Sequence, residues 1–161
     1  EGPQTSRLKA LAAELGLSDR VHFLGRLSHQ EKLTLVSACD VFVMPSTEPT
    51  EAFGIAQLEA MALHVPVVTT RLPTGVTDVA VDGETALLST PGDPVHLAIV
   101  LKRLLENALL RQNLVTEAAL RLREKYDINV ISMRTVHLIE AHMKGGSADN
   151  STEGRCALTS T

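Results

Sequence analysis

The sequence predicts an α/β protein built on a parallel, Rossmann-like sheet with helices on both faces. Apolar runs typical of buried strands alternate with helical patterns, and turn residues separate them. These runs are VFVM at 41–44, PVVTT at 66–70 and the shorter ALL at 86–88, with a further β-prone run, VHFLG, at 21–25. Strands joined by helices in this order imply right-handed parallel connections.

The first two helices are predicted from apolar spacing and from their ends. Residues 6–15 carry leucine and alanine at helical intervals, and Gly16 stands where a helix C-cap favours glycine. Ser28 and Glu31 form an S-x-x-E capping box, which predicts a helix over 29–38.

The later helices follow the same logic. A helix is expected over 54–63, and another begins where Asp93 acts as N-cap before Pro94. The helical pattern then continues to Met143, with interruptions near Asn107 and Asp127. In the last helix three apolar residues are expected to share one face: Ile131, Leu138 and Ile139.

Composition excludes several classes of function. Lys and Arg number 15 against 19 Asp and Glu, a net charge of −4, which is unlike a nucleic-acid binder. No apolar run approaches the roughly 20 residues that span a bilayer. The two cysteines form no disulfide framework or zinc motif. We expect Cys39 to be a buried thiol and the compartment to be cytoplasmic.

The domain boundaries follow from local composition. The 161 residues have room for about one domain, which we place at 1–143. Residues 144–161 are small and polar, which predicts a disordered tail. The chain starts abruptly at EGPQTSRLKAL without an initiator Met, so we expect a fragment.

Residues 45–68 hold the chemistry-bearing segment. A polar loop follows the strand at 41–44, and a helix then opens around Gly54. A helix N-terminus offers unpaired N–H groups that suit a phosphate, and ligands of open α/β sheets bind beyond the strands' carboxyl ends. Glu51 and Glu59 could flank a diphosphate held there, one reaching a sugar on each side. The alternative is that both glutamates lie on a solvated helix surface.

This segment resembles the paired-glutamate signature of the retaining glycosyltransferases of family four, glycosyl transferases group 1, which have the two-domain GT-B fold. The motif is EAFGIAQLE followed by AMA and VPVV, at residues 51–68. The stretches EGPQTSRLKALAAELGLSDRVHFLGRLSHQEKL, ACDVFVMPS and VAVDGETALLSTPGDP also resemble the family, in the right order. The resemblance implies the C-terminal half of a GT-B fold lacking its first strand or strands.

The resemblance implies a role for each matching residue. Glu51 would lie at the donor sugar as the catalytic residue, and Glu59 would bind the ribose hydroxyls. The backbone of the segment Phe53, Gly54 and Ile55 would face the diphosphate. The segment Leu24, Gly25 and Arg26 would lie beside the nucleotide base.

The resemblance also implies a reaction. A sugar, expected to be a hexose, would pass from a nucleotide sugar to an acceptor hydroxyl with retention of configuration. The leaving diphosphate would take the acceptor proton, so no metal and no cofactor is expected. The acceptor site would lie in an absent N-terminal domain, and the isolated fragment is expected to be inactive. Association of the parent protein with the cytoplasmic membrane face is a further expectation.

The sequence also departs from the family pattern. The family's usual Gly-Arg-Leu strand and nearby Lys, which clamp the phosphates, are expected ahead of the point that matches residue 1, so neither is expected among these residues. His64 stands where the family often has Gly, so it is expected to take a left-handed C-cap. Thr74-Gly75 is expected to form a turn. Two other functions remain open: a non-hydrolysing sugar-nucleotide epimerase of the same fold, and a non-catalytic nucleotide-sugar-binding module.

Overall fold

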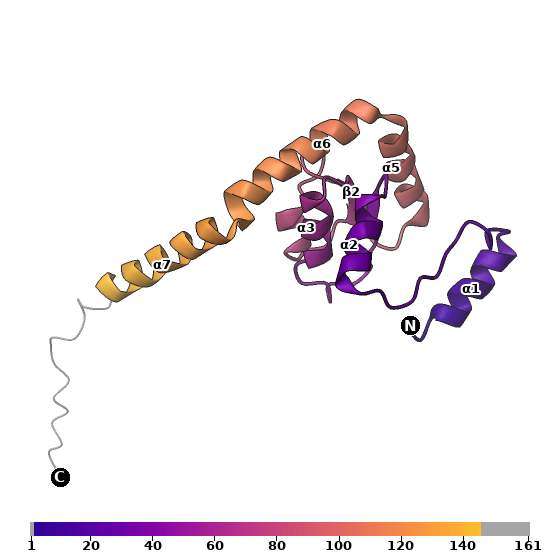
Figure 1. Ribbon diagram of the computed structural model, residues 1–161, viewed down its shortest axis with the longest axis horizontal. Helices are drawn as coiled ribbons and strands as arrows, with labels where there is room; N and C mark the ends of the chain where they lie inside the picture. The colour runs from indigo at the N-terminus through magenta and orange to yellow at the C-terminus, as the bar shows by residue number, and fades with distance from the viewer. Residues whose placement is uncertain (1, 146–161) are drawn as a thin grey trace, which may run out of the picture.

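The computed structural model describes residues 2–145 of the chain. A three-stranded parallel sheet lies at its centre, in the order β1 (Phe42–Met44), β2 (Val67–Thr70) and β3 (Leu87–Ser89) (Figure 1). The three predicted strands are thus confirmed, the third displaced by one residue. The predicted tail lies outside the described residues, apart from the two that extend the last helix to Gly145.

Helices cover both faces of the sheet. α3 (Ile55–Ala62) packs on one face, in the cluster that buries Val67 completely. α5 (Pro94–Glu106) packs on the other, in the cluster that buries Val68. Successive strand residues point to opposite faces, so these two neighbours serve different clusters. The predicted Rossmann-like arrangement is confirmed.

α6 (Ala108–Arg121) joins the two helical layers. It contacts both α3 and α5. Its Ala118 belongs to the cluster on the α3 side, whereas Leu114 belongs to the cluster on the α5 side. A single helix therefore links the two halves of the core.

Side-chain caps explain where several helices begin. Ser28 caps α2 (His29–Ser37) with the predicted capping box, in which the Glu31 carboxylate accepts from the Ser28 amide at 2.8 Å. The Ser28 hydroxyl also donates to Glu31, which holds the pKa of that carboxyl below its ordinary value. Asp93 accepts from the His96 amide at the start of α5, and Asn107 from the Leu110 amide at the start of α6.

The C-terminal helical region contains an element that the sequence did not predict. Between α6 and α7 (Ile128–Gly145) lies a π-helix, η1 (Leu122–Tyr126). The predicted interruption at Asp127 is confirmed, because its carboxylate accepts from the Asn129 amide at 2.8 Å. α7 extends away from the central body (Figure 1). The three residues expected to share a face are all exposed: Ile131, Leu138 and Ile139.

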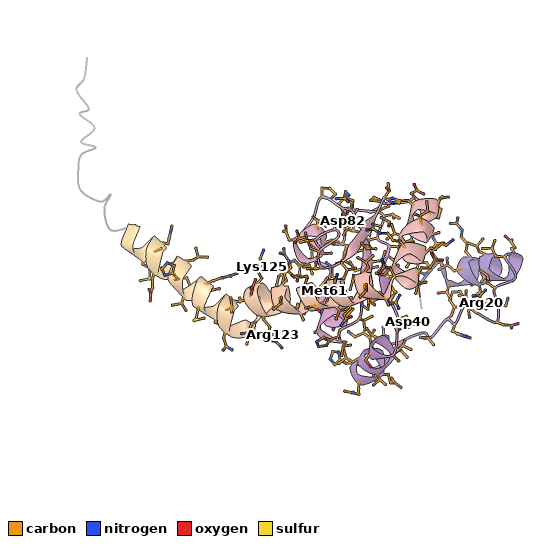
Figure 2. The ribbon with its side chains drawn as sticks, turned by 90° about the horizontal axis from the view of Figure 1, so that it is seen from above. Arg20, Asp40, Met61, Asp82, Arg123 and Lys125 are labelled. Atoms are coloured by element: carbon orange, nitrogen blue, oxygen red, sulfur yellow. The ribbon has the colours of Figure 1, made fainter. Side chains whose placement is uncertain are left out.

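The N-terminal segment stands apart from the central body (Figure 1), and in Figure 2 Arg20 lies within it while Met61 lies in the body. α1 (Thr5–Glu14) ends as predicted, with Gly16 at φ 66°. The β-prone run at 21–25 forms no strand, because no other strand among residues 2–145 pairs with it.

Two further expectations are wrong. Cys39 is exposed rather than buried, and its thiol donates to the Leu35 carbonyl at 3.2 Å. β1 is half-buried rather than buried on both faces, because it lies at the edge of the described sheet. The expected turn at Thr74-Gly75 is confirmed, because the Thr77 amide donates to the Thr74 carbonyl at 3.2 Å, and it leads directly into a short helix, α4 (Val76–Val79).

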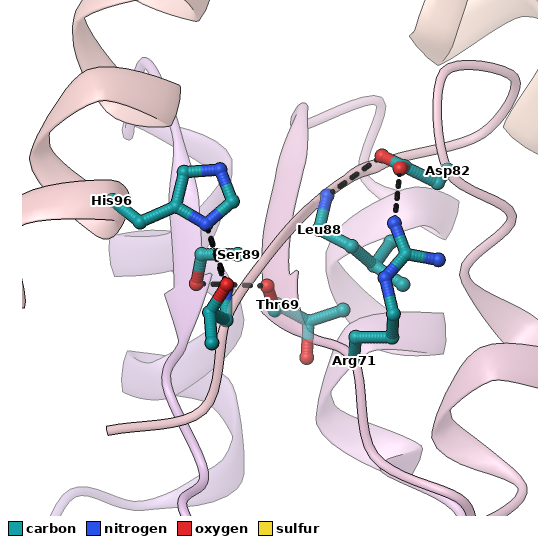
Figure 3. Close-up of polar contacts among 7 residues, drawn as sticks. Thr69, Arg71, Asp82, Leu88, Ser89 and His96 are labelled. Atoms are coloured by element: carbon teal, nitrogen blue, oxygen red, sulfur yellow. Dashed lines mark hydrogen bonds and ion pairs between the residues drawn. The ribbon is translucent and has the colours of Figure 1, made fainter. Parts of the chain in front are cut away.

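Polar contacts anchor the long connection between β2 and β3, which contains α4. Arg71 Nη2 lies 2.5 Å from Asp82 Oδ2, and the second oxygen of that carboxylate accepts from the Leu88 amide at 3.0 Å (Figure 3). The Ser89 hydroxyl donates to the Thr69 carbonyl across the two strands at 3.4 Å. Both ends of this connection are thereby held against the sheet.

The end of α3 gives a first testable prediction. His64 takes the predicted left-handed conformation, with φ 59°, in a motif where its amide donates to Met61 and that of Val65 to Ala60. His64→Gly removes the strain of a Cβ in this conformation, so we expect a stabilisation of about 1 kcal/mol and a melting temperature about 2–4 °C higher. Ala62→Gly, at the last residue of α3, is the control and should lower stability by up to about 1 kcal/mol. A loss of stability in His64→Gly would contradict this account.

Candidate functional site

The candidate site lies where the loop after β1 turns into α3. Gly54 is the N-cap of α3 and takes a left-handed conformation, with φ 75°. The Glu51 Oε1 atom accepts a hydrogen bond from the Gly54 amide at 2.9 Å. Glu51 Oε2 has no hydrogen-bond partner among residues 2–145. One oxygen of Glu51 thus shapes the loop while the other is free for a ligand.

The first turn of α3 contains backbone amides that donate no hydrogen bond within the described residues. The amides of Ile55 and Ala56 have no acceptor within the described part of the chain. The positive end of the helix dipole adds to their attraction for negative charge. Ile55 is 68% exposed and Ala56 is exposed as well, so this turn lies at the surface. An anion can therefore reach these two amides.

The second glutamate lies on the same helix but has a partner that the sequence analysis missed. Lys32 on α2 reaches Glu59 and places its Nζ atom 2.7 Å from each carboxylate oxygen. The side chains are 42% and 26% exposed, so the pair adds little to stability. Its effect is on geometry, because the ammonium holds both oxygens while each keeps a lone pair for another donor. No local sequence pattern indicates this ion pair, because Lys32 and Glu59 lie 27 residues apart in the chain.

Gln57 was also missed, and it lies between the two glutamates. It is fully buried, and its Nε2 atom donates to the carbonyls of Phe53 at 3.1 Å and Val76 at 3.0 Å. Its Oε1 atom is buried without a partner. A polar residue in an otherwise apolar helix face is the sequence signal that could have identified it.

The loop before α3 is held from two sides. A Cβ added to Gly75 would meet the Ala52 carbonyl oxygen at 2.8 Å, so the segment before α4 lies directly against this loop. The rings of Phe53 and Tyr126 also pack in a T-shaped arrangement, with their centroids 5.9 Å apart. The Tyr126 hydroxyl donates to the Asp78 carbonyl at 3.1 Å, which links η1 to α4 as well.

The structure does not bring the predicted base-binding segment to the glutamates. Leu24, Gly25 and Arg26 are exposed, and all hydrogen bonds of residues 2–26 lie inside that segment in the described chain. Leu24 lines a hollow with residues of α2, including Leu35. The physical reason is the unpaired run at 21–25, since an extended segment without a neighbouring strand has nothing to fix it beside the sheet.

A cavity of about 200 Å³ lies beyond the carboxyl ends of the strands, on the side of α5. Three of the hydroxyls around it already have partners: Thr70 donates to the Ser46 carbonyl, Ser89 to the Thr69 carbonyl, and the Thr90 hydroxyl lies 2.8 Å from Nδ1 of His96. Across residues 2–145 no cluster of acidic, histidine or cysteine side chains is arranged to hold a metal ion. None of the described helices is long and apolar enough to cross a membrane.

An open parallel sheet with an anion-accepting helix N-terminus beyond a strand end defines a Rossmann-like α/β domain. The model of the family glycosyl transferases group 1 matches residues 1–121, and the chain belongs to that family.

Individual relatives agree with this assignment. The chain is 33% identical over 125 residues to the D-rhamnosyltransferase WbpZ of Pseudomonas aeruginosa, covering 78% of this chain and 32% of that protein. It is 35% identical over 130 residues to an MMP alpha-(1->4)-mannosyltransferase of Mycolicibacterium hassiacum, with 81% and 31% covered. The structure of Anabaena Alr3699/HepE in complex with UDP-glucose matches with a TM-score of 0.76 and 27% identity, covering 87% and 38% of the two chains. This chain therefore spans about a third of the length of these relatives.

Proposed function

We propose that this chain is the donor-binding part of a glycosyltransferase that moves a hexose from a nucleotide sugar to an acceptor hydroxyl with retention of configuration. The observation that supports this most directly is the free first turn of α3, set between the carboxylates of Glu51 and Glu59. The Anabaena structure, which contains UDP-glucose, supports a nucleotide sugar as the donor.

The proposed reaction exchanges one bond at the anomeric carbon for another on the same face. The bond from that carbon to the diphosphate oxygen breaks, and a bond to the acceptor oxygen forms. The acceptor proton passes to the leaving diphosphate. The negative charge that develops there is stabilised by the amides of Ile55 and Ala56, which point at it before the reaction starts. This scheme uses no metal and no further cofactor.

Glu51 is assigned the role of positioning the donor sugar. Its free oxygen can accept hydrogen bonds from sugar hydroxyls, while the Gly54 amide keeps the carboxylate in place. A covalent mechanism with Glu51 as nucleophile is the alternative. The positioning role is favoured, because the hydrogen bond that Gly54 donates makes the carboxylate a weaker nucleophile.

Glu59 is assigned to the ribose of the nucleotide. The Lys32 ammonium orients its two oxygens, and each retains a lone pair for a ribose hydroxyl. The pairing of two neighbouring acceptors with two neighbouring hydroxyls gives this contact its directionality. We assign Phe53, Gly54 and Ile55 to the diphosphate through their backbone, and Leu24, Gly25 and Arg26 to the base side.

The proposal extends to the setting of the enzyme. We propose a cytoplasmic protein, acting at the inner membrane face if its acceptor is a lipid, with the acceptor bound by a separate N-terminal domain. The family match favours transfer over the epimerase reaction. A non-catalytic nucleotide-sugar-binding module is the remaining alternative, and turnover by the full-length protein would exclude it.

Binding of free nucleotides to residues 1–161 tests the site directly. Ligand-observed NMR with UDP, GDP and ADP should detect binding with a dissociation constant of about 1 mM for the preferred nucleotide. Glu59→Ala should abolish this signal, because a lost charge-assisted hydrogen bond costs about 1.5–3 kcal/mol.

Glu106→Ala is the matched control, since it removes the same charge from an exposed position on α5. It should bind as the unaltered chain does. Equal binding by the Glu59 and Glu106 variants would show that Glu59 does not contact the nucleotide.

A further inference from the structure

Gln57 joins two segments that lie far apart in the sequence. Its side chain is completely buried below the first turn of α3. The Nε2 atom donates at 3.1 Å to Phe53, in the loop that follows Glu51, and at 3.0 Å to Val76, at the start of α4. One amide group therefore holds the carbonyls of both segments.

The other half of the same amide has no partner. Gln57 Oε1 is buried without a hydrogen bond in the described chain. A buried acceptor left unpaired lowers stability, but an apolar side chain of equal size would lose both hydrogen bonds that Nε2 donates. The contribution of Gln57 therefore lies in the two carbonyls that it holds, not in a fully satisfied amide.

The neighbouring backbone leaves almost no room around this amide. A Cβ on Gly54 would lie 2.9 Å from Gln57 Nε2, and one on Gly75 would lie 2.8 Å from the Ala52 carbonyl oxygen. The loop from Glu51 to Gly54 is thus confined between the glutamine amide and the segment before α4. A shift of that amide would move the loop, and with it the carboxylate that Gly54 holds.

We infer that Gln57 is a positioning residue that sets the place of the Glu51 carboxylate relative to the free amides of α3. This inference rests on the proposed function, because it assigns the residue an effect on transfer. Gln57 is completely buried, so we assign it no contact with the donor. It therefore acts on turnover through Glu51 and leaves nucleotide affinity, which depends on Glu59, nearly unchanged.

Gln57→Met in the full-length protein tests the inference, because methionine has a similar length and makes neither hydrogen bond. We expect kcat to fall about tenfold or more, since small displacements at a reacting centre have large effects. The donor KM should stay within about twofold of the unaltered value. Amide exchange should become faster at residues 51–54 and stay unchanged in the β-strands. Gln57→Leu serves as a second variant if the first does not fold.

Leu114→Ala is the control for lost stability. Leu114 is buried in the cluster on the opposite face, so this variant should melt at a lower temperature yet keep its kcat while folded. An unchanged kcat and unchanged exchange at 51–54 in Gln57→Met would overturn the inference. So would faster exchange throughout the domain, which would indicate a general structural role. If the unaltered full-length protein transfers no sugar, the proposed function fails, and the exchange measurement alone decides whether Gln57 holds the loop.

Discussion

Glu51→Gln is expected to reduce turnover of the full-length protein by a factor of about 10²–10³. The change keeps the size of the side chain but removes the negative charge beside the sugar, and loss of one group that stabilises a transition state has effects of this size. The amide oxygen can still accept from Gly54, so the loop should keep its shape. The donor KM should change little, because the nucleotide is held elsewhere. Steady-state kinetics with varied donor concentration measures both quantities.

Glu48→Gln is the matched control for this experiment. Glu48 lies in the same loop after β1 and is exposed, so its replacement removes an equal charge from the neighbourhood without touching the site. Its kcat should equal that of the unaltered protein. If kcat fell by a similar factor in both variants, the cause would be the lower negative charge of the loop as a whole. Glu51 would then not contact the sugar.

The second large effect is expected from Gly54→Ala. The residue has φ 75°, and an added Cβ would lie 2.8 Å from Met44 Cε and 2.9 Å from Gln57 Nε2. We expect a loss of about 2–4 kcal/mol in the free energy of unfolding, because strain in the backbone and a forced shift of packed side chains add together. Chemical denaturation of residues 1–161 measures this loss.

Gly83→Ala separates the two contributions. Gly83 has nearly the same backbone conformation, φ 76°, but a Cβ there would meet nothing within 4 Å. Its free energy of unfolding should fall only by the cost of backbone strain, about 1–2 kcal/mol. If the free energy of unfolding fell equally in both variants, the close packing around Gly54 would contribute nothing to stability. The confinement of the Glu51 loop would then be refuted.

Local chemistry made much of this fold predictable. The capping box of Ser28 and Glu31, the Asp93 cap and the left-handed His64 depend on residues within a few positions of one another, so their patterns are visible in the sequence. The alternation of apolar runs and helices predicted the parallel sheet for the same reason. The run at 21–25 failed because a strand also needs a partner, which a local pattern does not supply.

The candidate site also has features that the sequence predicts and features that it does not. The helix N-terminus at Gly54 and the spacing of the two glutamates could be predicted, since loop and helix adjoin in the chain. The partners that orient them could not. Lys32 reaches Glu59 across 27 residues and Gln57 reaches Val76 across 19, and both contacts depend on how the helices pack. The expectation that Leu24, Gly25 and Arg26 lie beside the nucleotide stays a prediction.

The contact between Phe53 and Tyr126 has a spectroscopic consequence. The chain has one tyrosine and no tryptophan, so nearly all of its near-ultraviolet absorption and emission comes from Tyr126. That ring lies against the loop of the candidate site, and its hydroxyl is bonded to the Asp78 carbonyl. A ligand that moves Phe53 changes the surroundings of this single chromophore. The protein therefore carries its own optical reporter at the site, and no label has to be attached.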